Sequence, residues 1–320
     1  MNRRLYWILV SMLLLWNVAA GQNPWKINLA VNGMYDNNIL NYSQYDIQRF
    51  LNDTEVHRSV IHTFDDFIVR ATAEAEYVSR KFPKHPVRAR VMFRNYAYTV
   101  NGIKDYQLYR LDLRWHTRKR NYLSADYRLI PRYYLRHYID RDRSFSLADN
   151  SEAYLACTFQ LQQMNLDYTH YWRSNVFTSL GVEANWLWYN PDFTEYDTRA
   201  LGIRVESFYF LKSWIKLGLQ YQYSYGDNVG RNPERPSGDS DLSYNQHELT
   251  WKLRTDINNV LGWRDLEIDL NVYERLRNYT SDAPAEADVF HSGRRNWRHR
   301  FDISASMDLV PYLDAVLRYE

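Results

Sequence analysis

Apolar and polar side chains alternate along most of the chain after residue 24. In the first such segment Trp25, Ile27, Leu29 and Val31 are separated by polar or small residues. Successive side chains of a β-strand point to opposite faces, so this period of two predicts strands with one apolar and one polar face. The sequence therefore predicts an all-β protein.

The same alternation recurs in twelve further segments. Each has about the length that a tilted strand needs to cross a bilayer, roughly 9 to 11 residues. We assign the apolar rows to a lipid-facing side; in the sixth segment this row is Leu155, Cys157, Phe159 and Leu161. The thirteen rows lie within residues 25–31, 67–77, 87–93, 109–115, 123–129, 155–161, 180–188, 201–205, 215–223, 249–253, 266–272, 301–309 and 313–319.

Long and short connections alternate between these segments. The long ones cover residues 36–66, 136–152, 189–197, 226–243 and 274–296, and the short ones cover residues 79–86, 117–121, 172–175, 211–213 and 310–312. Residues 100–105 are few for a long loop, and residues 255–265 are many for a short turn. Outer-membrane barrels have short periplasmic turns and longer outside loops. The pattern thus predicts a transmembrane antiparallel up-and-down β-barrel with its N-terminus in the periplasm.

Twelve of the predicted strands are complete, and a thirteenth over residues 312–320 stops partway. Single-chain bacterial barrels have an even number of strands. They are also similar to one another in ending on an aromatic residue, whereas this sequence ends on Glu320. We therefore expect 12–14 strands. Either the C-terminus is truncated and the intact barrel has fourteen, or a twelve-stranded barrel carries an overhang.

Residues 1–20 predict a secretory signal peptide. Arg3 and Arg4 form its charged region, an apolar stretch follows, and small residues precede a cleavage site that we place after Ala20. No cysteine follows to carry a lipid anchor, and no later apolar run reaches the roughly 18 residues of a membrane-spanning helix. Residues 21–320 then form a single outer-membrane β-barrel domain.

The composition is typical of a membrane interface. Aromatic residues make up 16% of the sequence, with 28 Tyr and 11 Trp. These two residue types gather where one end of the ring is dry and the other wet. The one cysteine, Cys157, has no partner for an intramolecular disulfide, and we interpret it as a small apolar side chain.

The signal peptide, the period of two and the loop alternation together resemble bacterial outer-membrane β-barrel proteins of the porin-like class, over essentially all of residues 21–320. No motif assigns a particular family. The resemblance implies a location in the outer membrane of Gram-negative bacteria. It also implies outer-membrane lipid, lipopolysaccharide and the barrel assembly machinery as partners.

With the apolar rows toward lipid, the opposite rows line the interior, and on four consecutive strands they are rich in arginine. Neighbouring strands lie roughly 4.8 Å apart, so these guanidinium groups are predicted to form a basic wall. Residues 67–143 hold 18 Lys and Arg against 7 Asp and Glu. The predicted basic wall consists of Arg70, Arg88, Arg90, Arg94, Arg110, Arg114, Arg128 and Arg132.

The rest of the chain holds 22 basic and 31 acidic residues, and part of the acidic surplus falls on interior positions of later strands. The predicted acidic wall consists of Glu183, Glu206, Glu248, Glu267, Asp269, Asp302 and Asp308. A basic wall opposite an acidic one resembles the constriction of general porins, where a transverse field selects polar solutes. Channels for acidic oligosaccharides are similar on the basic side, where arginines pair with carboxylates in bidentate fashion.

The favoured hypothesis is therefore a pore, without enzymatic activity, for passive passage of small polar or anionic solutes, acidic oligosaccharides among them. The alternative is a non-conducting structural, anchoring or assembly barrel whose interior is closed by salt bridges between the two walls. An interior of twelve to fourteen strands is usually too wide for side chains alone to fill. This width favours the pore.

A third hypothesis is a barrel hydrolase acting at the outer rim. Its best candidates are His291 and Ser292, in a predicted outside loop. Neighbouring residues on a strand point to opposite faces, so the two act together only in an irregular loop. A plain polar loop explains them as well, and we predict no catalytic residues. The nine His show no metal-ligand spacing, and we predict no metal, no cofactor and no nucleic-acid binding.

Overall fold

The computed structural model describes residues 24–52, 60–79, 85–118, 120–140, 142–143, 154–230, 241–257, 264–281, 284–286, 288, 291–310 and 313–319. The predicted signal peptide, residues 1–20, lies outside these ranges. Within them, no helix has both the length and the apolar character needed to cross a membrane.

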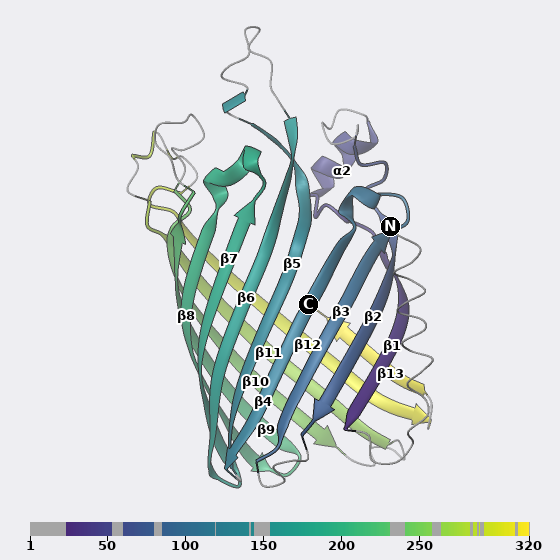
Figure 1. The fold of residues 1–320 in the computed structure, drawn as a ribbon, viewed down its shortest axis with the longest axis vertical. Coiled ribbons are helices and arrows are strands. Elements are labelled where there is room, and N and C mark those ends of the chain that lie inside the picture. The colour runs from purple at the N-terminus through teal and green to yellow at the C-terminus, as the bar shows by residue number, and fades with distance from the viewer. Residues whose placement is uncertain are drawn as a thin grey trace.

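In the described part of the chain, thirteen strands form one sheet in which each strand pairs with its neighbours in the sequence (Figure 1). All the pairings are antiparallel. The all-β class and the up-and-down order predicted from the sequence are therefore confirmed. The strands are β1 (Trp25–Asp36), β2 (Asp66–Val78), β3 (Val87–Tyr98), β4 (Tyr106–Arg118), β5 (Asn121–Ile139), β6 (Tyr154–Arg173), β7 (Val176–Tyr189), β8 (Thr198–Lys212), β9 (Ile215–Asn228), β10 (Tyr244–Ile257), β11 (Arg264–Tyr279), β12 (Arg295–Val310) and β13 (Leu313–Tyr319).

Long connections gather at one end of the sheet, which we call the loop end, and short ones at the other, which we call the turn end (Figure 1). The loop end carries the helix α2 (Gln44–Leu51) and the 3-10 helices η3 (Gly102–Lys104) and η4 (Pro191–Tyr196). The predicted alternation of loop lengths is confirmed except at residues 99–105, a loop-end connection that is shorter than the turn-end connection of residues 79–86. The connection around η3 is compact because a 3-10 turn reverses the chain in a few residues.

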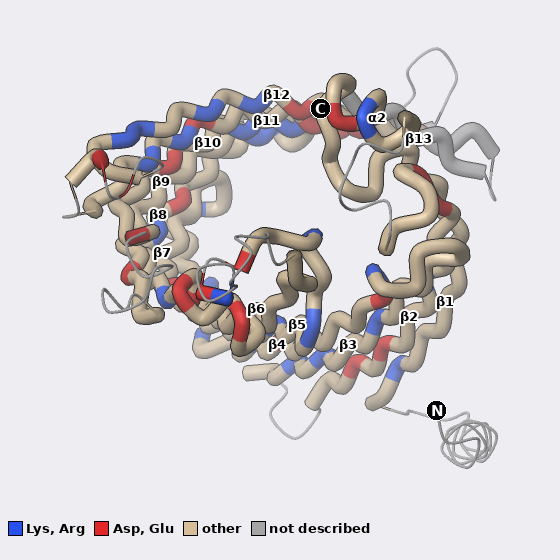
Figure 2. The backbone as a smooth tube through the Cα atoms, turned by 90° about the horizontal axis from the view of Figure 1, so that it is seen from above, with Lys and Arg blue, Asp and Glu red and all other residues tan. Residues whose placement is uncertain are grey.

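The sheet curves round into a ring-like outline when it is seen from above (Figure 2). Its two edges, β1 and β13, meet no other strand: no backbone pairing joins them among the residues that the structure describes. We call this place the seam. Because alternate strands reverse direction, β1 and β13 run the same way.

A β-bulge interrupts β5 at Pro131. Ile130 pairs with Leu161 and Tyr133 pairs with Phe159, so two residues of β5 lie opposite a single residue of β6. Proline has no amide hydrogen to give to a ladder, and bulges are where sheets tolerate it. The extra residue changes the parity of β5, so that Ile130 and Tyr133 share a face although they are three positions apart.

β6 corrects one prediction about faces. Leu161 lies on the same face as Asn165, and the other face carries Met164 and Leu166, which are 45% and 42% exposed. The predicted lipid-facing row, Leu155 to Leu161, is therefore on the polar side of the sheet. The prediction was wrong because a period of two shows that faces alternate but does not show which parity faces outward.

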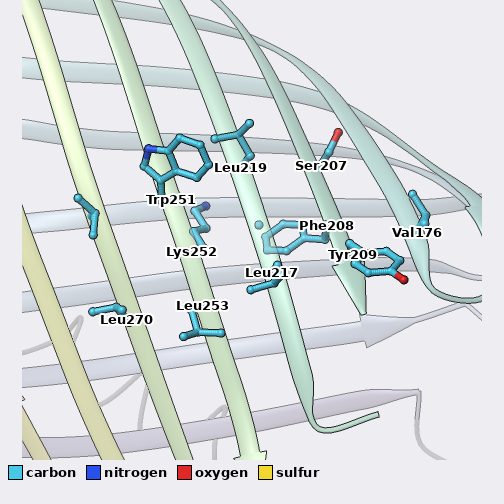
Figure 3. Close-up of a pocket in the computed structure, with 12 residues that line it drawn as sticks. Val176, Ser207, Phe208, Tyr209, Leu217, Leu219, Trp251, Lys252, Leu253 and Leu270 are labelled. Atoms are coloured by element: carbon cyan, nitrogen blue, oxygen red, sulfur yellow. The ribbon is translucent and has the colours of Figure 1, made fainter. Parts of the chain in front are cut away.

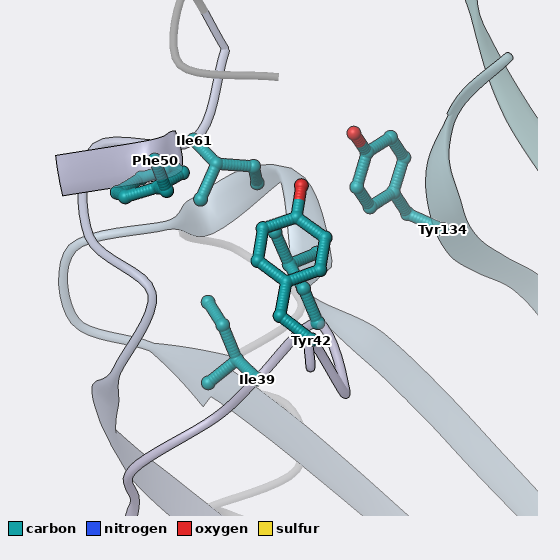
Figure 4. Close-up of a cluster of buried hydrophobic side chains, with 6 residues drawn as sticks. Ile39, Tyr42, Phe50, Ile61 and Tyr134 are labelled. Carbon is teal, nitrogen blue, oxygen red and sulfur yellow. The ribbon is translucent and has the colours of Figure 1, made fainter. Parts of the chain in front are cut away.

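We call residues 37–65 the first loop; its described residues, 37–52 and 60–65, form a small hydrophobic core at the loop end. Phe50 of α2 is fully buried, in a cluster that also contains Ile39, Tyr42, Ile61 and Tyr134 of β5 (Figure 4). A capping box at Ser43 starts α2. The first loop is therefore attached to the sheet by apolar contacts.

A buried carboxylate fixes the same loop to the connection between β3 and β4. Asp66 is 3% exposed and accepts hydrogen bonds from the backbone N–H groups of Thr99 (3.0 Å) and Asn101 (2.8 Å). The side-chain oxygen of Asn101 in turn accepts from the N–H of His62 (2.8 Å). Buried polar groups need such partners, and these join three chain segments at one point.

Candidate functional site on the inner face

The two faces of the sheet differ sharply in exposure, as β9 illustrates. Leu219, Tyr221 and Tyr223 are 41%, 44% and 37% exposed, whereas the intervening Gln222 and Ser224 are 6% and 7% exposed. Side chains on the inside of a curved sheet crowd together, and those on the outside spread apart. The polar set therefore lies on the concave side, which we call the inner face, and the apolar set lies on the outer face.

The outer face is apolar and open over many strands. Val31 of β1, Leu180 of β7 and Ile203 of β8 are 73%, 54% and 60% exposed. Soluble monomers rarely expose contiguous apolar patches larger than a few hundred Å². A shallow apolar depression of about 440 Å³ crosses the outer face from β7 to β11, lined among others by Leu219 and Trp251 (Figure 3).

Most of the predicted basic wall lies together on the inner face. Arg132 does not continue the row: it lies in the β5 bulge, has no partner in the ladder and is exposed. The bulge breaks the parity from which the sequence placed it with the others. By strand register, the inner face carries Arg70, Arg88, Arg90, Arg94, Arg110, Arg114 and Arg128.

Acidic residues stand between these arginines. Arg90 pairs with Asp112 (2.9 Å), and Arg110 pairs with both Asp112 (2.8 Å) and Asp126 (2.6 Å). The sequence analysis did not include the two aspartates, although they share the parity of the neighbouring arginines on β4 and β5. Part of the basic charge is thus neutralised within the wall itself.

Other arginines of the wall have neutral contacts. Arg70 donates to the side-chain oxygen of Asn32 (3.3 Å), and Arg94 donates to the hydroxyl groups of Thr72 and Tyr96 (both 3.3 Å). Neither forms a salt bridge with any residue that the structure describes. Hydrogen bonds to neutral oxygens leave the charge of a guanidinium in place.

Arg114 and Arg128 also lack a carboxylate partner in the described chain. The guanidinium of Arg114 lies over the ring of Tyr122, 4.8 Å from its centroid. The Nε atom of Arg128 is buried and has no hydrogen-bond partner. A buried guanidinium nitrogen without an acceptor is costly, and no carboxylate of the described residues neutralises this charge.

The predicted acidic wall is on the inner face as well. The side chain of Asp308 falls outside the described part of the structure, where only its backbone pairing with Arg264 is given. By strand register, the inner face carries Glu183, Glu206, Glu248, Glu267, Asp269 and Asp302.

Basic residues lie between these acids, as aspartates lie between the arginines of the basic wall. Lys252 pairs with Glu206 (2.6 Å), and Arg254 contacts both Glu267 and Asp269. The predicted separation of one basic wall from one acidic wall is therefore incomplete. Blue and red segments follow one another round the ring in Figure 2.

One ion pair bridges over a glycine. Arg204 of β8 reaches Asp167 of β6 (2.7 Å) across Gly181 of β7, which lies between them in the ladder. A Cβ added to Gly181 would lie 2.1 Å from the Asp167 carboxylate. The absence of a side chain at this position is thus what lets the two charges meet.

The described salt bridges of the sheet all run along it. Each joins residues of one strand, of adjacent strands, or of strands two apart, such as Arg204 with Asp167. None of those in the described residues joins β2–β5 to β8–β12 across the interior. The closed arrangement predicted as the alternative, with salt bridges from wall to wall, is not seen in this part of the chain.

Lys104 lies above the inner face, in η3 at the loop end. It is 5% exposed, and its ammonium lies 5.9 Å from the ring centroid of Tyr133 and 5.7 Å from that of Tyr134. Burial lowers the pKa of Lys104 to about 8, opposed by the charge of Asp36 and assisted by that of Arg136.

Of the two residues of the hydrolase hypothesis, the His291 side chain lies in a hydrogen-bonded loop cluster, and the backbone N–H of Ser292 donates to the Asp288 carbonyl (3.1 Å). The Nδ1 atom of His291 contacts the carboxylate of Asp288 (2.9 Å), which also accepts from the Ser281 hydroxyl (2.8 Å) and the Asp241 backbone N–H (3.0 Å). Hydrogen bonding to these groups lowers the pKa of Asp288 against the opposing effect of burial. Asp288 therefore joins the β9–β10 and β11–β12 connections.

The described residues contain no group of three or more His, Cys, Asp or Glu side chains arranged to hold a metal ion. Comparison with models of known protein families gives no match, and comparison with curated proteins gives none either. The geometry of the two faces is thus the basis on which a function is proposed.

Proposed function

We propose that this protein forms a β-barrel in a bacterial outer membrane and passes small polar or anionic solutes through a water-filled interior. The proposal is carried by one observation: a single sheet has an exposed apolar outer face and a charged inner face. Hydrocarbon outside and water inside satisfy both faces, as in other membrane barrels. Lipid, lipopolysaccharide and the assembly machinery belong to this proposal as partners.

A membrane location requires the seam to close. Unpaired N–H and C=O groups cost several kcal/mol each in hydrocarbon, which is why open sheet edges do not occur there. β1 presents 12 residues along its edge. We therefore place backbone pairing across the seam in the functional protein.

An open interior is supported by the direction of the ion pairs. Side chains that neutralise one another along the wall are not available to close the lumen between walls, as Arg110 with Asp112 and Lys252 with Glu206 illustrate. A sheet of thirteen strands also encloses more space than its own side chains usually fill. Both features favour conduction over a sealed barrel.

A preference for anions is supported by the arginines that lack carboxylate partners. Fixed positive charges in a narrow aqueous passage raise the local concentration of anions. Arg94 and Arg128 are the most informative pair to remove. Neither forms a salt bridge with the described residues, so the loss of either leaves no described carboxylate without its cation.

Planar-bilayer recording tests the proposal. We expect steady single-channel conductance and a reversal potential in a KCl gradient that indicates chloride preference. In the Arg94→Ser, Arg128→Ser double variant the chloride-to-potassium permeability ratio should fall roughly twofold or more, because local anion enrichment weakens. Arg199→Ser is the matched control: Arg199 lies on the outer face, beside Trp186 in the register, and pairs there with Asp227.

The outcomes separate the hypotheses. A folded, inserted protein that stays silent would support the non-conducting barrel and contradict the pore. Conductance with cation preference would keep the pore and contradict the role of the arginines. An equal shift of selectivity in Arg199→Ser would show that the inner position of Arg94 and Arg128 does not matter.

A further inference from the structure

The inner face is not polar everywhere. Four aliphatic side chains from four consecutive strands lie side by side near the loop end: Leu108, Ile130, Leu161 and Leu187. Ile130 pairs with Leu161 and Leu161 with Leu187 in the ladder, and Leu108 is two positions from Arg110 on the same face of β4. All four are partly exposed.

A row of aromatic rings adjoins these residues on their loop side. Tyr96 stacks on Tyr106 with centroids 4.3 Å apart and planes inclined by 11°, and the row continues to Tyr133 (5.1 Å), Phe159 (5.3 Å) and Tyr189 (5.6 Å). Each ring comes from the next strand, β3 to β7, and each is partly exposed. We call the four aliphatic residues and the five rings together the inner apolar patch.

Packing of the first loop does not explain the patch. The hydrophobic core of that loop lies against Tyr98, Ile103 and Ala156, with Tyr134 inside it, and thus borders the patch instead of covering it. In a water-filled passage the patch keeps apolar surface wet, which is unfavourable in proportion to its area. An apolar solute removes that cost when it binds.

Two guanidinium groups border the same patch. Arg94 is paired with Leu108 in the ladder and donates to the hydroxyl of Tyr96 (3.3 Å). Arg128 is two positions from Ile130 on the same face and has the buried, unpartnered Nε atom. The patch therefore combines a flat apolar surface with two cations that lack carboxylate partners among the described residues.

We propose that the inner apolar patch, together with Arg94 and Arg128, binds an amphiphilic carboxylate: a small solute with a flat aromatic body and one carboxylate group. The site rests on the proposed function, because it lies on the proposed pathway. The planar fork of a guanidinium matches a carboxylate in bidentate geometry, and rings and aliphatic side chains favour contact with an aromatic body.

Binding of 2-naphthoate to the purified full chain in detergent micelles tests the site without requiring conductance. Isothermal titration should give an affinity about tenfold above that of acetate, which has the charge alone, and of 2-naphthylmethanol, which has the body alone. The same naphthoate should reduce single-channel current at concentrations where acetate does not.

Variants assign the effect to the patch. Arg128→Gln and Leu161→Thr should each weaken naphthoate binding about tenfold, since one removes the charge and the other interrupts the apolar row. The matched control is Arg300→Gln on the inner face of β12, where Arg300 pairs with Asp302 (2.9 Å). Its affinity for naphthoate should stay within about twofold of the wild type.

The possible results are distinguishable. Equal affinity for acetate and naphthoate, or an equal loss in Arg300→Gln, would overturn the site and leave a general anion pathway. A channel that conducts but neither binds naphthoate nor is blocked by it would overturn the site and leave the pore. A silent protein with the expected variant pattern would instead overturn the pore and keep the site.

Discussion

At the scale of single residues, the inner face shows that a missing side chain can matter as much as a charged one. Gly181 lies beneath the ion pair between Arg204 and Asp167, on a strand that neither charged residue belongs to. Both charges are largely shielded from solvent, with 24% and 19% of their side chains exposed. Their attraction is therefore screened less than that of a surface pair.

Gly181→Ala is expected to destabilise the protein by about 1 to 3 kcal/mol, because the added carbon displaces Asp167 and breaks a half-buried pair. Urea unfolding in micelles, followed by tryptophan fluorescence, measures this change. Gly102→Ala is the control, because its added carbon meets only the Asp105 carboxylate, at 4.0 Å. Equal stability of the two variants would contradict the account of Gly181.

The sequence predicted which arginines lie on the inner face more reliably than which residues they pair with. Seven of the eight wall arginines fall on the inner face, because a period of two extends without error along an unbroken strand. Arg132 was misplaced because the bulge at Pro131 adds a residue, and a proline in a strand is the one local signal that could have indicated it. The partners Asp112 and Asp126 depend on register between strands, which no single strand reveals.

At the scale of elements, strands and loops differ in how far the sequence determines them. The order of long and short connections was predicted, whereas α2 inside the first loop was not, since eight residues give too short a periodic pattern. The faces of β6 were assigned wrongly, because its two halves carry their apolar residues at opposite parity. Tertiary contacts determine both the formation of α2 and which face of β6 points inward.

The attachment of the first loop should depend on pH through Lys104. Its pKa is lowered to about 8 by burial, so the docked loop favours the uncharged amine, whereas the undocked chain keeps an ordinary value near 10.4. The docked loop is therefore least stable, relative to the undocked chain, below about pH 8. Its stability rises with pH between the docked pKa and the undocked pKa of Lys104.

Hydrogen-exchange protection factors for residues 39–50 at pH 7 and pH 9.5 check this expectation. They should rise about tenfold in the wild type and stay level in Lys104→Met. Lys26→Met, on the exposed edge strand β1, should behave as the wild type does. A rise of equal size in Lys104→Met would assign the pH dependence to another group.

At the scale of the whole molecule, the sequence predicted an up-and-down all-β sheet, which the structure confirms, and a closed barrel, for which the described residues show no pairing across the seam. Alternation and loop order determine an up-and-down sheet, but the partner of an edge strand is a long-range property. With thirteen strands, β1 and β13 run in the same direction. Direct pairing between them is therefore parallel, whereas pairing of β1 with β12 is antiparallel.

Of the two strands that the structure describes at that edge, we expect β13, and not β12, to pair with β1. A fourteenth strand, as the sequence allows, would instead lie between β13 and β1. In a Cys157→Ser background, Asn28→Cys should form a disulfide with Val316→Cys on β13 when the protein is in lipid, and not with Ser306→Cys on β12, the position that pairs with Val316 in the ladder. Non-reducing electrophoresis before and after oxidation measures both. A disulfide to position 306 alone would show that β13 is bypassed, and reactive thiols that never join would show that β1 pairs with neither of these two strands.

The hairpin of β5 and β6 extends beyond the rest of the sheet at the loop end. β5 and β6 have 19 and 20 residues, about 9 more than a bilayer crossing uses, and β5 rises above its neighbours at the loop end (Figure 1). At roughly 3.4 Å per residue the surplus is about 30 Å along the strand. In the proposed outer-membrane barrel, with the loop end outside the cell, this ridge is within reach of an antibody or a bacteriophage.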